Sequence, residues 1–69
     1  MKIQVGDIIG LFGWISGQRI VKVMGHDRYL LDDGQEAALS DVAVVQSDNG
    51  DGTATETFSD GRIRTVELE

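Results

Sequence analysis

The stretch from Gln18 to Gly34 constrains the fold of this chain more than any other. It contains two short runs of mostly apolar, β-prone residues, at 20–24 and 29–31, separated by the turn-forming sequence GHDR. A helix would need ten or more residues with a regular apolar period, so runs this short favour two strands joined by a tight turn. Glycine and aspartate suit such a turn. We therefore predict a central β-hairpin that ends at the sequence DDG.

The spacing of the two runs leaves the strand register of this hairpin open. A two-residue loop would place Val21 opposite Leu30. A three-residue loop would place Val21 opposite Leu31 and Val23 opposite Tyr29. We favour the three-residue loop, because it puts four apolar side chains on one face. The predicted core consists of Val21, Val23, Tyr29, Leu31, Leu39 and Val44.

The segments that flank the hairpin also favour strands. Residues 3–12 form a mostly apolar stretch that breaks at Gly6-Asp7, and we expect Phe12, at its end, to lie in the core. Residues 13–17 are predicted to form a glycine-rich loop that carries one large aromatic side chain. After the hairpin, a single 3₁₀ turn is expected at 40–42, because serine and aspartate can bond nearby backbone amides.

A second hairpin is predicted near the C-terminus. A polar, glycine-rich break at 46–52 precedes two β-prone runs, 53–58 and 62–68, on either side of an Asp-Gly pair. With a two-residue Asp-Gly loop, Phe58 would lie opposite Ile63. A lone hairpin is unstable in water, so this one must pack on the rest of the chain, extend its sheet or pair with a second copy.

Length and charge limit the classes of function. A chain of 69 residues forms one domain with a modest core. Twelve acidic and six basic residues give a net charge of −6, which disfavours direct nucleic-acid binding. The chain has no cysteine, so it has no disulfide and no thiolate metal site. No apolar run approaches membrane length, and we expect a protein of the bacterial host cytoplasm without a membrane contact.

Five features of residues 5–45 occur in a characteristic order. They are a Val-Gly-Asp turn before the first strand, a loop from Trp14 to Gly17, Tyr29 in the second hairpin strand, the DDG turn, and a 3₁₀ turn at Asp41-Val42. In this order they resemble the Tudor or SH3-like barrel superfamily. The resemblance implies a five-stranded SH3-like barrel, which we place in residues 1–47. With the hairpin predicted above appended in residues 48–69, the expected fold is all-β.

The candidate site residues fall into two sets. In barrels of this type the loops hold the binding groove, so one set lies in and beside the tryptophan loop. This predicted partner-binding set comprises Trp14, Ser16, Arg19, Asp32 and Asp33. The second set is a predicted acidic surface comprising Asp48, Asp51, Glu56, Asp60 and Glu67.

Catalytic, metal and cofactor sites are not predicted. The single histidine, His26, lies in the hairpin turn without a partner at useful spacing. Residues 48–52 lack the ligand spacing of a calcium loop. The chain also has fewer aromatic residues near the tryptophan loop than a methylated-lysine cage requires. We therefore predict that the chain is not an enzyme and holds no cofactor and no metal.

The leading functional hypothesis is a non-catalytic protein-interaction module of bacterial or phage origin, which binds a protein partner through the Trp14 loop and the adjacent barrel surface. One alternative is an acidic phage-type inhibitor, anti-CRISPR-like for example, that occupies a nucleic-acid-binding site of its target. Another is a structural component of a phage particle or assembly. Acids clustered on one face would favour the inhibitor, whereas an apolar patch around Trp14 would favour the module. A homodimer through the C-terminal hairpin is a further prediction.

Overall fold

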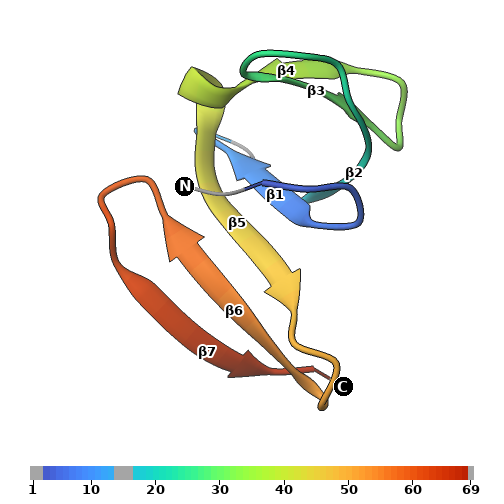
Figure 1. The fold of residues 1–69 in the computed structure, drawn as a ribbon. Helices are drawn as coiled ribbons and strands as arrows, with labels where there is room; N and C mark the ends of the chain where they lie inside the picture. The colour runs from blue at the N-terminus through green and yellow to red at the C-terminus, as the bar shows by residue number, and fades with distance from the viewer. Residues whose placement is uncertain (1–2, 14–16, 69) are drawn as a thin grey trace.

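The computed structural model describes residues 3–13 and 17–68 as an antiparallel β structure with one short 3₁₀ helix. This confirms the all-β class. The sheet has seven strands in the order β4-β3-β2-β1-β5-β6-β7 (Figure 1). The elements are β1 (Ile8–Leu11), β2 (Gln18–Val23), β3 (Arg28–Leu31), β4 (Glu36–Ala38), η1 (Leu39–Asp41), β5 (Val42–Asp48), β6 (Thr53–Phe58) and β7 (Ile63–Glu67).

Strand β1 lies at the middle of this sheet. Strands β1 to β4 follow one another as antiparallel neighbours, and η1 then leads into β5, which pairs with the other side of β1. In Figure 1 the first four strands curl round, while β6 and β7 form a ribbon beside β5 and away from that curl. The hairpin of β6 and β7 therefore extends the sheet of its own chain through β5.

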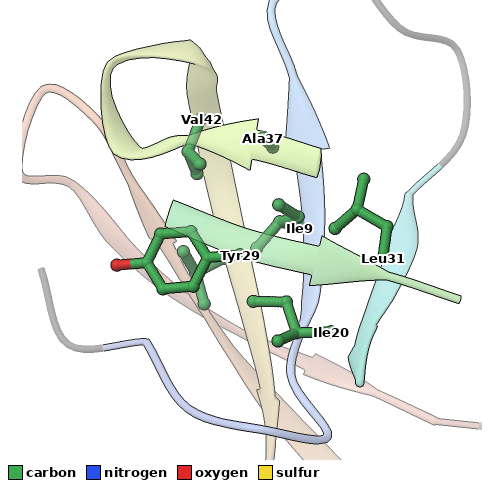
Figure 2. Close-up of a cluster of buried hydrophobic side chains, with 7 residues drawn as sticks. Ile9, Ile20, Tyr29, Leu31, Ala37 and Val42 are labelled. Atoms are coloured by element: carbon green, nitrogen blue, oxygen red, sulfur yellow. The ribbon is translucent and has the colours of Figure 1, made fainter. Parts of the chain in front are cut away.

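The core lies inside the curl (Figure 2). Strands β1 to β5 each contribute at least one buried side chain, and β6 and β7 contribute none to this cluster. Ile3, Leu11 and Leu39 pack against it and are partly buried. The buried members are Ile9, Ile20, Tyr29, Leu31, Ala37, Val42 and Val45.

A bulge in β2 changes which residue lies opposite Leu31. The register shifts between Ile20 and Lys22, so Ile20 lies opposite Leu31 and is fully buried. The predicted pairing of Val23 with Tyr29 is confirmed, but the predicted pairing of Val21 with Leu31 is wrong. Val21 and Val23 are 46% and 42% exposed, so neither is a core residue. An extra residue on one strand reverses the facing of the residues before it, and the apolar pattern does not reveal it.

A second register shift determines which residues of β5 are buried. Between Gly10 and Leu11 the register moves by one residue, and Val42 and Val45 become the buried residues of β5. The predicted core residue Val44 lies opposite Gly10 and is only half-buried. Close approach explains this glycine, since a Cβ on Gly10 would lie 3.0 Å from Val44 Cγ1.

The remaining predicted core residues and the 3₁₀ turn lie close to where they were expected, except for Phe12. Tyr29 and Leu31 are buried as expected, and Leu39 is partly buried at the margin of the core. The 3₁₀ helix covers Leu39–Asp41, one residue earlier than predicted. Phe12 is not in the core, because 62% of its surface is exposed.

The Val-Gly-Asp sequence forms a turn that attaches the N-terminal segment to β2. Gly6 has a φ of +94°, and Asp7 Oδ2 accepts a hydrogen bond from the Gln4 N–H at 3.1 Å. The Gly6 N–H donates to the Ile20 carbonyl at 2.9 Å, and the Ile20 N–H donates to the Asp7 carbonyl at 2.8 Å. These bonds give the buried carboxylate of Asp7 a partner and fix the backbone of the core residue Ile20.

The C-terminal hairpin has a three-residue loop rather than the predicted two-residue loop. The Phe58 N–H donates to the Arg62 carbonyl at 2.8 Å, and Gly61 has a φ of +92°. Ile63 consequently pairs with Thr57 and not with Phe58. Glycine at the left-handed position is typical of three-residue hairpin loops, which explains why the Asp-Gly pair does not form the whole loop.

The bulge in β2 predicts different effects for adjacent substitutions. Ile20→Ala should lower the free energy of unfolding by about 2–5 kcal/mol, because it leaves a cavity in the core. Val21→Ala should change it by less than about 1 kcal/mol, because that side chain is largely exposed. Urea unfolding of the two variants measures the difference. Equal losses would contradict the observed facing of β2.

Candidate functional site

The tryptophan loop joins β1 to β2, and its described ends are Phe12-Gly13 and Gly17. The predicted site residues Trp14 and Ser16 lie outside the described residues. At the first end, the Phe12 N–H donates to the Asp41 carbonyl at 3.1 Å, which ties the loop to the end of η1. This fixes the backbone of Phe12 while its ring remains exposed.

Close packing explains the glycine at the other end of the loop. A Cβ on Gly17 would lie 2.5 Å from Ile8 Cγ2 and 3.2 Å from the Ile9 carbonyl oxygen. Only glycine fits there without moving β1. Both described ends of the loop are therefore held against the sheet or η1, and the exposed aromatic Phe12 stands at its start. Sequence reasoning missed Phe12 as a surface residue, although Gly13, which has a φ of +85°, marks the end of the apolar run there.

Arg19 and the DDG turn are neighbours through the backbone. The Asp32 N–H donates to the Arg19 carbonyl at 2.9 Å, and Arg19 Nη1 donates to the Gly6 carbonyl at 3.2 Å. Asp33 Oδ1 accepts the Gln35 N–H at 2.9 Å, so this carboxylate stabilises its own turn. The structure thus brings Arg19 and Asp32 of the partner-binding set together, with Asp33 beside them.

A small pocket also contains Arg19 and joins it to the acidic set through Asp48. Its volume is about 120 Å³. Sites for drug-sized ligands are larger, roughly 300–1,000 Å³, so this pocket suits at most a small group on a bound partner. Its lining residues are Gly6, Ile8, Arg19, Gln46, Asp48, Ala54 and Leu68.

Three of the five predicted acidic-surface residues stabilise turns. Asp48 Oδ1 accepts the Gly50 N–H at 2.7 Å, and Asp51 Oδ1 accepts the Thr53 N–H at 3.0 Å. Asp60 accepts the N–H and Nε of Arg62 at 3.0 and 2.7 Å. Asp48 and Asp51 lie before β6 and Asp60 lies after it, so these carboxylates occupy opposite ends of that strand.

The two glutamates of the predicted acidic set also lie apart. Glu56 pairs with Arg64, whose Nε donates to Glu56 Oε1 at 2.9 Å, across β6 and β7. Glu67 pairs with Thr53 at the other end of the same two strands, so these two side chains share a face. Thr53 is three positions from Glu56 along β6, and Glu56 and Glu67 therefore lie on opposite faces. The structure therefore does not gather the five acids into one cluster.

A cluster of an aromatic ring and two cations lies at the loop end of this ribbon. The guanidinium carbons of Arg62 and Arg64 lie 5.0 and 5.7 Å from the centroid of the Phe58 ring, within the range of cation–π attraction. Both arginines also have acidic partners, Asp60 and Glu56. This cluster was not predicted, because it depends on the three-residue loop that brings Arg64 opposite Glu56.

Residues 3–13 and 17–68 contain no group of three or more histidine, cysteine, aspartate or glutamate side chains placed to hold a metal ion. The same residues also contain no helix that is long and apolar enough to cross a membrane. His26 lies exposed in the turn between β2 and β3.

Comparison of the chain with protein-family models, with curated proteins and with solved structures finds no match. Function is therefore to be inferred from the residues of this chain alone.

The hydrogen bonds of the turns predict how two carboxyl groups titrate. The Thr53 hydroxyl and N–H lower the pKa of Asp51 below its usual 3.8, and the Arg62 N–H and charge lower the pKa of Asp60. A lowered pKa means that each ionised carboxylate stabilises the fold above about pH 4. That stabilisation is lost as the pH falls through the lower, folded-state value.

Thr53→Val should raise the pKa of Asp51 towards 3.8, because it removes the hydroxyl donor, and should leave the pKa of Asp60 unchanged. Carboxyl carbon NMR shifts followed from pH 7 to pH 2 measure both values. An unchanged pKa of Asp51 in the variant would show that the hydrogen bond from the Thr53 hydroxyl does not lower that pKa.

Proposed function

We propose that this chain is a non-catalytic protein-interaction module with an SH3-like barrel, which binds a protein partner through the loop at residues 12–17 and the surface beside it. The topology supports the barrel. Four consecutive antiparallel strands, a 3₁₀ helix and a fifth strand that returns to β1 follow the order that the resemblance implies. The curl of these strands around one core agrees with that order (Figure 1).

The exposure of Phe12 is the observation on which the proposed binding site rests. Phe12 keeps 62% of its surface exposed, and its backbone is fixed by the bond from its N–H to the Asp41 carbonyl. Aromatic side chains held on rigid supports are frequent anchors of protein interfaces. Trp14, two residues later, adds a second aromatic to the same loop.

The polar groups beside the loop are available for directional contacts. Asp32 is exposed next to Arg19, and neither carries a described ion pair. The chain's net charge of −6 favours a partner surface that is basic rather than a nucleic acid. The inhibitor alternative has weaker support, because the five acids it requires are spread over both ends of β6 and both faces of the ribbon.

The proposal predicts that Phe12→Ala reduces binding without unfolding the chain. Truncating an interface anchor costs about 2 kcal/mol or more, which is a loss of binding of more than about tenfold. The stability should change by less than about 1 kcal/mol, because the ring is exposed. Val5→Ala is the matched control, since Val5 is equally exposed but precedes β1, whereas Phe12 follows it.

Immobilised parent, Phe12→Ala, Trp14→Ala and Val5→Ala chains are exposed to an extract of the source organism, and retained proteins are quantified by mass spectrometry. We expect at least one protein that the parent and Val5→Ala retain and that the two aromatic variants lose. Equal retention by all four chains, or retention of nothing above a bare resin, rejects the proposed site.

A further inference from the structure

Strand β7 presents an open edge of the sheet. It is the last strand in the sheet order, and no described strand pairs with its outer side. The Phe58 N–H donates to the Arg62 carbonyl, and the Leu68 N–H donates to the Gly52 carbonyl, each at 2.8 Å. Backbone groups alternate in direction along an antiparallel strand. Arg62, Arg64, Val66 and Leu68 therefore bond to β6, while the N–H and C=O groups of Ile63, Thr65 and Glu67 point outward.

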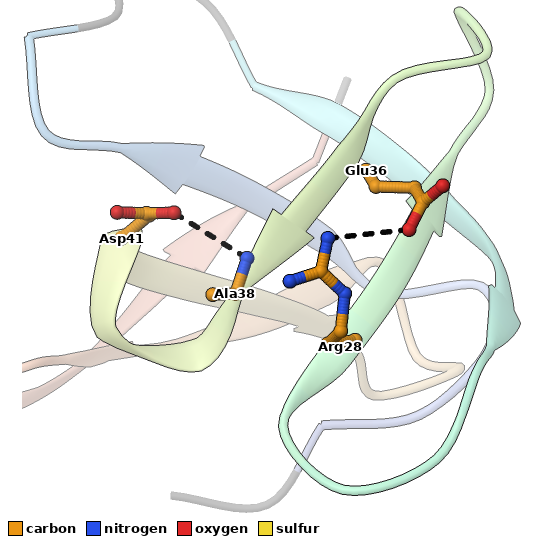
Figure 3. A network of polar contacts seen from close by, with 4 residues as sticks. All are labelled: Arg28, Glu36, Ala38 and Asp41. Atoms are coloured by element: carbon orange, nitrogen blue, oxygen red, sulfur yellow. Dashed lines mark hydrogen bonds and ion pairs between the residues drawn. The ribbon is translucent and has the colours of Figure 1, made fainter.

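The opposite edge of the sheet, β4, is much less available. It is only three residues long. One of its outward N–H groups, that of Ala38, donates to Asp41 Oδ2 at 3.4 Å (Figure 3). The side chain of Glu36, at the other end of β4, is held by Arg28 at 3.3 Å. Short strands, charged side chains and covered amides are the usual protections of an edge, and β7 has the longer uncovered edge of the two.

We propose that β7 pairs with β7 of a second copy of the chain, antiparallel and around a two-fold axis through Thr65, so that the two sheets become one. Antiparallel pairing requires outward-pointing residues to face each other. Centring the pair on Thr65 uses all three of them. Thr65 faces Thr65 of the partner subunit, and Ile63 faces Glu67 of the partner subunit.

The side chains of β7 suit this register. Arg64 faces Val66 of the partner subunit and Arg62 faces Leu68 of the partner subunit, so no like charges lie directly opposite each other. Centring the pair on Arg64 instead would oppose two arginines. Centring it on Val66 would leave Ile63 opposite the last residue of the chain and use fewer outward groups. The Thr65 register is thus the self-complementary one.

Charge also favours a second copy over a foreign strand of either sign. Although the chain carries a net charge of −6, the charges of Arg64 and Glu67 cancel within β7. The strand therefore neither attracts an acidic or basic peptide strongly nor repels its own copy. Ile63, which is 69% exposed, gains cover from the partner's strand.

The absence of cysteine allows the register to be tested by disulfide formation. In the proposed dimer, two facing Thr65 Cα atoms lie about 5.5 Å apart, within the disulfide range of roughly 4.4–6.8 Å. Thr65→Cys should therefore form a covalent dimer under mild oxidation at micromolar concentration. Ile63→Cys is the matched control, because the two Ile63 residues lie four positions apart along the strands, or about 13 Å.

A mixing experiment tests the same register in the other direction. Ile63→Cys and Glu67→Cys chains should each remain largely uncrosslinked alone but should crosslink when mixed. Crosslinking of Ile63→Cys alone as fast as Thr65→Cys would indicate random collision and overturn the proposal. Failure of Thr65→Cys to crosslink faster than a cysteine placed at exposed Val5 would overturn it as well.

Thr65→Pro provides a test without cysteine. Its N–H points outward, so proline removes a bond to the partner but none to β6, and proline is tolerated in edge strands. By sedimentation at micromolar concentration we expect a dimer mass for the parent and for Thr65→Val and a monomer mass for Thr65→Pro, with melting temperatures within a few degrees. A parent monomer, or a Thr65→Pro dimer, rejects the β7 contact.

Discussion

The pairing of β5 with β1 is the contact on which the rest of the structure depends. Every other strand pair joins elements that follow each other in the chain, whereas this one joins segments at the two ends of the curl. It places Ile9 opposite Val45, and both are almost fully buried. Closing so long a loop costs chain entropy before any contact forms, and burial in the shared core offsets that cost. Without this pair, β1 to β4 would form a meander with one uncovered face.

Strand β5 belongs both to the buried core and to the exposed C-terminal ribbon. Its first residues, with Val42 and Val45, complete the core, while its last residues serve as the template for β6. In the ribbon of β6 and β7, Ala54 is the only residue that is buried. Backbone pairing, Asx turns and the cluster around Phe58 hold the ribbon, and it has little apolar area to release by further packing. Its remaining unpaired backbone groups lie along the outer edge of β7, where the proposed second copy would pair.

The sequence predicted the existence of elements better than their facing. The central hairpin, the pairing of Val23 with Tyr29 and the all-β class follow from short apolar runs separated by glycine turns, which is local information. The burial of Ile20 instead of Val21 depends on a bulge that leaves no mark in the pattern of apolar residues. A loop one residue longer than expected changed every pair in the second hairpin, and with them the Glu56–Arg64 contact. The exposure of Phe12 follows once Ile9 and Leu11 are known to face the core, since the next side chain points to the other face, but the unbroken apolar run did not show that facing in advance.

The two proposed contact surfaces depend on different chemistry and lie on different parts of the sheet. The loop at residues 12–17 follows β1 and uses aromatic side chains, whereas β7 lies beyond β5 and β6 and uses backbone groups. A dimer through β7 therefore leaves both loops uncovered. Two loops on one rigid sheet would bind a target with two sites more tightly than either loop alone, since the second contact becomes intramolecular. In the proposed dimer, a domain with so small a core would gain both buried area and binding strength from its own copy, without a larger fold.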